Sequence, residues 1–194
     1  MSNSSADALG QAVLATMRHN FTMYKGLADR ALAQLTPAEW FFRPAPGANS
    51  AAVIVQHMVG NLRSRFTDFL TTDGEKPDRR LDQEFEEPDA PAETYVSALR
   101  AQWEAAWQIL FNLLDILQPN DLLRTVTIRG EAHSVLAALE RQVAHYSSHA
   151  GQIVQLAKQI RGTEWQNLSV PRGQSENFIR QVLLRANPRQ DSLV

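Results

Sequence analysis

The feature that most constrains the fold of this chain is the spacing of its apolar residues along four long segments. Within each segment apolar side chains recur every three to four positions, which places them on one face of an α-helix. The segments span about residues 9–35, 51–70, 92–117 and 134–160. A helix with one apolar face buries that face against other elements, so the pattern predicts an all-α protein built as a helical bundle.

Residues with capping preferences mark the ends of two of these helices. Asn49 and Ser50 are both good N-caps for the second helix, and Ser134 is one for the fourth, because their side-chain oxygens accept hydrogen bonds from first-turn N–H groups. Gly162 can end the fourth helix, since glycine tolerates the left-handed conformation that often follows one. A further short helix is expected at about 176–186.

Two connections differ from ordinary loops. Helical periodicity is lost from 71 to about 91, between the second and third helices, and a connection this long is typical of a crossover or a functional loop. The β-prone residues 125–128 are followed by Arg129 and Gly130, which favour a turn. The sequence therefore predicts a long crossover and one small extended piece.

Composition favours one soluble domain over residues 1–194, with a bundle core at about 6–161 and an extension at 162–194. The formal net charge of −2 gives no reason to expect nucleic acid or an anionic membrane as a partner. No apolar run approaches the length of a membrane span, and the first residues lack a signal-peptide pattern, so we expect a cytoplasmic protein. The chain has no cysteine, so a bound metal would have nitrogen and oxygen ligands only. Those ligands favour zinc, nickel, cobalt, iron or manganese.

Three histidines have the spacing of a metal site. His145 and His149 are four residues apart on the fourth helix, so both rings lie on one face and can reach one ion. His57 lies near the middle of the second helix and can supply a third ligand, because metal sites in bundles are built from facing helices. A single core histidine bonded to a carbonyl explains His57 as well. His19 reads as exposed, and His133 as a loop or capping residue before Ser134.

Neighbouring polar residues can support such a site. Gln142 and Gln152 can orient the ring nitrogens that do not bind the ion. Asn61 lies one turn after His57, where it can contact water or substrate or make a hydrogen bond between helices. No carboxylate is placed beside the histidines, since Asp68 and Glu140 read as surface residues.

These motifs together resemble the DinB-like (YfiT-like) metalloprotein superfamily. The resemblance rests on a mid-helix histidine after Asn49-Ser50, followed about 90 residues later by His145-Tyr-Ser-Ser-His149-Ala-Gly-Gln-Ile153. Segments 60–65, 72–77 and 168–175 are similar to an uncharacterised bacterial branch of that superfamily. The resemblance implies a four-helix bundle with a long crossover, usually a homodimer. It also implies nickel, zinc or a related ion at His57, His145 and His149.

Characterised members of the superfamily are thiol S-transferases that use bacillithiol or mycothiol, whereas many other members have no known reaction. Without cysteine in the chain, the thiol would be an external low-molecular-weight compound. A three-histidine site leaves a coordination position open, so we expect a metal-dependent transferase or hydrolase that acts on a small-molecule substrate. Arg63, Arg65 and Arg172 can each bind an anionic substrate, and Arg172, in the loop after the fourth helix, is the most suggestive of them. An exposed surface position explains Arg172 as well.

The alternative is a non-catalytic dimeric helical bundle with a structural or ligand-sensing metal. Trp103, Trp107 and Phe111 on the third helix can provide an apolar dimer surface, although core packing explains them equally well.

Overall fold

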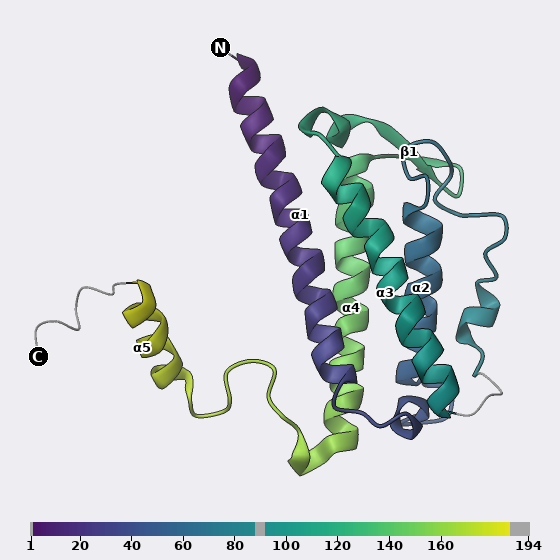
Figure 1. Ribbon diagram of the computed structural model, residues 1–194. Helices are drawn as coiled ribbons and strands as arrows, with labels where there is room; N and C mark the ends of the chain where they lie inside the picture. Colours follow the sequence, from purple (N-terminus) through teal and green to yellow (C-terminus); the bar gives the residue numbers. More distant parts are fainter. Residues whose placement is uncertain (1, 88–91, 187–194) are drawn as a thin grey trace, which may run out of the picture.

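The computed structural model describes residues 2–87 and 92–186 and confirms the all-α fold (Figure 1). Its helices are α1 (Ser2–Leu32), α2 (Ala51–Phe66), α3 (Ala92–Ile116), α4 (Val135–Arg161) and α5 (Ser175–Ala186). The single-turn 3-10 helices are η1 (Ala38–Phe41), η2 (Asp82–Phe85), η3 (Pro119–Leu123) and η4 (Gly162–Glu164). A small antiparallel hairpin pairs β1 (Thr125–Ile128) with β2 (Glu131–Ser134).

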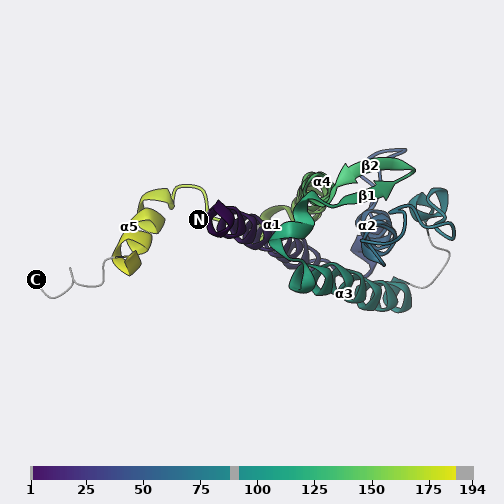
Figure 2. The same ribbon diagram turned by 90° about the horizontal axis from the view of Figure 1, so that it is seen from above.

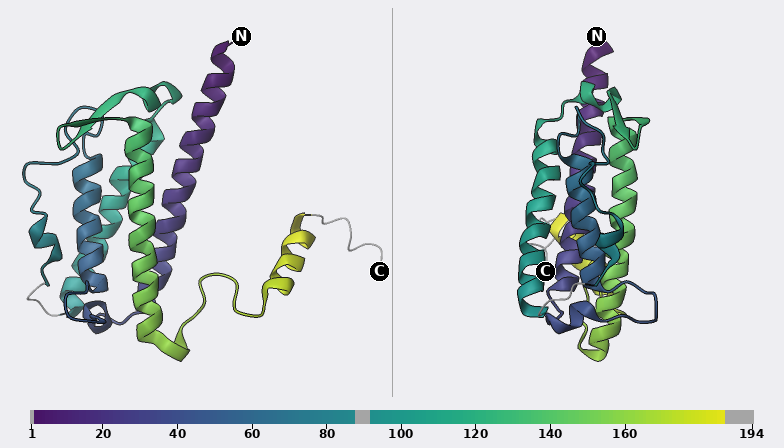
Figure 3. Two further views of the ribbon diagram at one scale, coloured as in Figure 1. Left: turned by 180° about the vertical axis from the view of Figure 1, so that it is seen from behind. Right: turned by 90° about the vertical axis from the view of Figure 1, so that its right-hand side faces the viewer.

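The first four helices form the bundle. Helix α1 packs mainly against α4 and α2 mainly against α3, while α2 also contacts α4. Figures 1 and 3 show that α1 and α4 run in one direction and that α2 and α3 run in the other. Because α2 and α3 are parallel, their connection has to return along the bundle, as the predicted crossover does. Residues 88–91 of that connection lie outside the described part of the chain.

Side-chain and glycine caps set the helix ends as the sequence predicted. Of the two candidates for α2, Ser50 is the N-cap, and its Oγ accepts from the backbone N–H of Val53 at 3.3 Å. Ser134 caps α4 in the same way, through the N–H of Ala137 at 3.1 Å. Gly162 ends α4 with a φ of 52°, a conformation that costs glycine little.

Helix α2 is shorter than the sequence pattern indicated. It ends at Phe66 instead of near Leu70, because Thr67 is extended and Asp68 has a φ of 49°. Leu70 and Phe69 still pack on the core after the break, which is why the apolar pattern continued past the helix end.

The hairpin is fastened to the crossover at its turn. Arg129 and Gly130 both have positive φ, at 56° and 76°, as a tight two-residue hairpin turn requires. The carboxylate of Asp73 accepts from the backbone N–H groups of both residues, at 2.8 and 2.9 Å. The N–H of Gly74 donates to the Thr127 carbonyl at 2.8 Å. The start of the crossover is therefore held against the end of the bundle.

A cluster of aromatic rings fills the middle of the bundle. The Tyr146 ring centroid lies 6.0 Å from that of Phe21 and 5.3 Å from that of Trp107, joining α4 to α1 and α3. Trp103 and Trp107 are both buried and Phe111 packs on the core. Core packing therefore accounts for these three aromatics, and within the described chain they form no exposed apolar patch on α3.

The segment after α4 extends away from the bundle. Residues 171–185 are all exposed, and α5 stands apart from the other helices (Figure 2). Its exposed apolar side chains are Phe178, Ile179, Val182, Leu183 and Leu184. Over the described residues, no helix combines the length and apolar character that crossing a bilayer requires.

Candidate metal site

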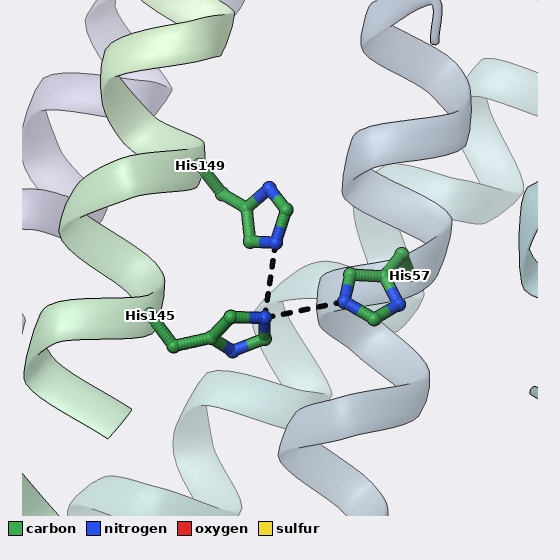
Figure 4. Close-up of side chains that lie close together, drawn as sticks. All are labelled: His57, His145 and His149. Atoms are coloured by element: carbon green, nitrogen blue, oxygen red, sulfur yellow. Dashed lines mark hydrogen bonds between the residues drawn. The ribbon is translucent and has the colours of Figure 1, made fainter. Parts of the chain in front are cut away.

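Three histidine rings from two neighbouring helices meet between α2 and α4. Figure 4 shows His145 and His149 on one helix turned toward His57 on the other. The Nε2 atom of His145 lies 3.3 Å from Nε2 of His57 and 3.0 Å from Nε2 of His149. One possible ligand atom from each ring lies within 4.8 Å of the other two. The structure therefore brings together the three histidines that the sequence singled out.

The outer nitrogens of two of these rings lie beside hydrogen-bond acceptors. Nδ1 of His57 is 2.9 Å from a carboxylate oxygen of Glu84, and Nδ1 of His149 is 2.9 Å from Oε1 of Gln152. Both partners are acceptors, so each Nδ1 carries the proton and each Nε2 of a neutral ring keeps a lone pair. Both lone pairs face Nε2 of His145, which can donate at most one proton. A cation among the three Nε2 atoms would accept all three lone pairs and satisfy the cluster.

Burial keeps two of the rings in the neutral form that binds metals. Desolvation, followed by the charges of His149 and His57, lowers the pKa of His145 to about 3. Desolvation also lowers the pKa of His149, although its hydrogen bond with Gln152 opposes that shift. Metal ions bind only neutral imidazole. At neutral pH neither ring would have to release a proton before binding an ion.

Glu84 is a functional candidate that the sequence interpretation missed. It lies in η2 of the crossover, is only 8% exposed and accepts from Nδ1 of His57. Burial alone would raise the pKa of Glu84, but hydrogen bonds from Arg79 and His57 outweigh burial and lower it. A carboxylate that accepts from the outer nitrogen of a histidine fixes the ring and makes its other nitrogen a better ligand. The expectation that no carboxylate lies near the histidines was therefore wrong.

A chain of ion pairs holds Glu84 in place. Arg79 binds its carboxylate through two nitrogens, each at 2.8 Å, in the bidentate geometry that makes such pairs strong. Arg79 also lies 3.4 Å from Glu75, which in turn pairs with Arg65 at 3.1 Å and Arg129 at 2.9 Å. These residues come from α2, the crossover and the hairpin. The network therefore links the position of His57 to the contact between the crossover and the hairpin turn.

Gly60 makes room for this carboxylate. A Cβ atom built on Gly60 would lie 2.0 Å from Oε1 of Glu84, much closer than a nonbonded contact allows. Gly60 lies three residues after His57, so it is on the same face of α2. A glycine inside a helix lowers stability relative to alanine, so its presence often means that another group approaches the backbone closely. Gly60 was therefore the sequence signal that could have indicated a contact at this point of α2.

The other predicted supporting residues have different outcomes. Gln152 contacts Nδ1 of His149 as expected. Gln142 is buried, but its Oε1 has no hydrogen-bond partner in the described chain, so it does not orient His145. Asn61 accepts from the Tyr146 hydroxyl at 2.9 Å, which is the bond between helices that the sequence left open.

The remaining candidates lie away from the rings. His19 is exposed, as expected. His133 is on β2 opposite Val126, so the prediction of a loop position was wrong. Asp68 and Glu140 are exposed, and Asp68 follows α2 instead of lying on it. Arg172 is also exposed, in the segment after α4, and its binding of an anionic substrate stays a prediction.

The comparison with protein families gives one match. Residues 8–174 match the family described as a protein of unknown function, DUF1572. Because the match covers most of the chain, the chain belongs to this family. The matched region contains the bundle except for the first six residues of α1, together with the crossover and all three histidines, and it ends just before α5. Searches of curated proteins and of solved structures gave no match.

Proposed function

We propose that the protein binds one divalent metal ion through Nε2 of His57, His145 and His149. The observation that carries this proposal is the meeting of three Nε2 atoms from two helices, with Nε2 of His145 lying 3.3 Å from that of His57 and 3.0 Å from that of His149. The spacing supports it as well: ligands at about 2.0–2.1 Å from a tetrahedral zinc ion lie about 3.3 Å apart. The Nε2 separations of 3.0 and 3.3 Å are close to that value.

We further propose that the ion serves catalysis, in a transferase or hydrolase that activates a thiol or water. Three protein ligands leave a coordination position open, as in catalytic rather than structural sites. A bound divalent ion would lower the pKa of a thiol or water next to it. The thiol would be an external small molecule, because the chain has no cysteine. Nitrogen ligands suit zinc, nickel, cobalt, iron or manganese, and the resemblance favours nickel or zinc among them.

The chain's own residues would position the ligands. Glu84 holds the Nδ1 proton of His57 and Gln152 that of His149, so both rings present a lone pair to the ion. The Phe85 ring lies against His57, with centroids 4.7 Å apart, and limits its rotation. These contacts would keep the site preorganised before the ion binds.

Membership of the DinB-like superfamily is part of the proposal. The bundle, the crossover between α2 and α3 and the positions of the three histidines all agree with what that resemblance implies.

Metal content of untagged protein tests the site. We expect about one ion per chain in the wild type and in His19→Ala, whose histidine is exposed. His149→Ala should lose the ion or bind it far more weakly, since two imidazoles remain. Unchanged stoichiometry in His149→Ala would remove the basis of the proposal.

A homodimer is a separate proposal, which rests on the resemblance. The buried aromatics of α3 do not supply its interface. The exposed apolar side chains of α5 are available for one. Light scattering tests it, and a mass near the 21.7 kDa of one chain would contradict it.

A further inference from the structure

A cavity with an unusual lining lies beside the histidine cluster. Its volume is about 280 Å³, and it is bordered by His57 and His145 together with residues of the crossover and hairpin. At about 30 Å³ for each water in the liquid, this volume corresponds to roughly nine water molecules. The cavity is therefore large enough for a small metabolite or for the reacting end of a larger one.

Four arginines border this one cavity. They are Arg65, Arg79, Arg129 and Arg141. The first three share only two carboxylates, those of Glu75 and Glu84, so one positive charge remains in excess. Arg141 on α4 adds another and has no ion-pair partner among the described residues. The cavity wall is thus electropositive without any metal.

Among the described residues, three of the six buried side-chain polar atoms without a hydrogen-bond partner belong to residues that line this cavity. Nε of Arg65, Oε1 of Gln142 and Nδ1 of His145 are buried and form no hydrogen bond within the described chain. All three belong to residues that line the cavity. Arg65 is 4% exposed and Gln142 is 3% exposed, so bulk water does not satisfy them. Such atoms cost about 1–3 kcal/mol each unless something binds them.

We infer that this cavity binds the acid group of a small organic anion, a carboxylate or a phosphate. Arg65 still has its Nε–H to donate, and Arg141 has its whole guanidinium group. Guanidinium donors match the oxygens of carboxylates and phosphates. If Nε2 of His145 binds the ion, Nδ1 carries the ring proton and adds a third donor. The amide oxygen of Gln142 can accept from a hydroxyl or amino group of the same ligand.

This inference deepens the proposed function, and it rests on that function only for the chemistry that would follow binding. An acid group held by the arginines would place the rest of the ligand next to His57 and His145. The substrate, or the thiol that reacts with it, would then be an acid. The arginines are present without an ion, so the acid group should also bind the metal-free protein.

Titration calorimetry with succinate and with inorganic phosphate tests the inference. Each probe is added at constant ionic strength to protein freed of metal and to protein loaded with zinc. The variants are Arg141→Gln, which borders the cavity, and Arg63→Gln, an exposed arginine of α2 that does not. Both substitutions remove one positive charge, so their comparison separates local contact from net charge.

We expect one probe molecule per chain to bind the metal-free wild type and Arg63→Gln with similar affinity. Arg141→Gln should bind about tenfold more weakly, as the loss of one charge-assisted hydrogen bond predicts. The inference is overturned if no saturable binding occurs without metal, or if the two variants weaken binding equally. If the protein binds the anion through Arg141 but takes up no zinc, the proposed function is overturned and the inference about the anion site stands.

Discussion

Replacing Glu84 with glutamine tests how the crossover controls the metal site. The carboxylate accepts from Nδ1 of His57 and from two nitrogens of Arg79. An amide has the same shape, but it has only one oxygen to share between these donors. If the NH₂ group of the glutamine faces Arg79, two donors face each other. If it faces His57, Nδ1 of His57 must accept, so the ring proton moves to Nε2 of His57 and blocks metal binding there.

The size of the effect follows from these contacts. Loss of a partner of this kind weakens metal binding about 10- to 100-fold. At a zinc concentration about 1,000 times the wild-type Kd, zinc should raise the free energy of unfolding of the wild type by about 4.1 kcal/mol. In Glu84→Gln the same concentration is only about 10 to 100 times Kd, so the gain should be about 1.4–2.7 kcal/mol. The metal-free variant should also be about 1–3 kcal/mol less stable, because Arg79 stays buried without its full partner.

Chemical unfolding with and without zinc, together with calorimetric zinc titration, measures both effects. Glu86→Gln is the matched control, since Glu86 is exposed and only two residues away. The control should behave like the wild type. If Glu84→Gln binds zinc as tightly as Glu86→Gln and unfolds at the same denaturant concentration, the proposed positioning of His57 by Glu84 is refuted.

Three further perturbations test other parts of the structure. Gly151 has an open position on α4, so Gly151→Ala should stabilise the protein by about 0.5–1 kcal/mol. Gly60→Ala should give no such gain and should weaken zinc binding, because the new Cβ would displace Glu84. Equal shifts in the melting temperature of the two variants would contradict this. Hydrogen bonds from the backbone N–H groups of Glu75 and Gly130 are the main reason why the pKa of Asp73 lies below its ordinary value of 3.8. The ionised carboxylate of Asp73 therefore stabilises the folded protein above pH 3.8, and this stabilisation is lost as the pH falls below that value. The difference in free energy of unfolding between the wild type and Asp73→Asn should therefore shrink as the pH falls from 6 to 2. A constant difference would refute the stabilising contact between the Asp73 carboxylate and the hairpin turn. Removal of residues 175–194 should leave the free energy of unfolding of the monomer unchanged, since the described part of this segment is exposed. A loss above about 1 kcal/mol would indicate a contact of this segment with the bundle or with a second chain.

The helices and the three histidines could be predicted because both depend on local spacing. The apolar period defines each helix, and an interval of four residues puts His145 and His149 on one face whatever the rest of the fold. The pairing with His57 also needed α2 and α4 to be neighbours, which the resemblance implied and the bundle now provides.

Glu84 could not be predicted because its contact depends on the path of the crossover. It lies 27 residues after His57, in an acidic stretch where Asp82, Glu86 and Glu87 are equally plausible partners. Only the folded connection selects one of them. Gly60 was a usable signal, since a glycine one turn from a candidate ligand indicates a close approach.

The expected role of Gln142 failed for a different reason. A separation of three residues places its side chain on the same side of α4 as His145, but spacing does not determine where the amide points. The structure leaves Oε1 of Gln142 and Nδ1 of His145 both without a partner at the edge of the cavity. The sequence thus located a residue of the pocket and assigned it the wrong contact.

X-ray absorption spectroscopy of the zinc-loaded, untagged protein tests the central claim most directly, because it counts the atoms bound to the ion. We expect three imidazole nitrogens at about 2.0–2.1 Å and at least one further light-atom ligand from outside the chain. His149→Ala should reduce the imidazole count to two. A shell of oxygen atoms with one imidazole or none, unchanged by that substitution, would show that the three rings do not share a metal ion.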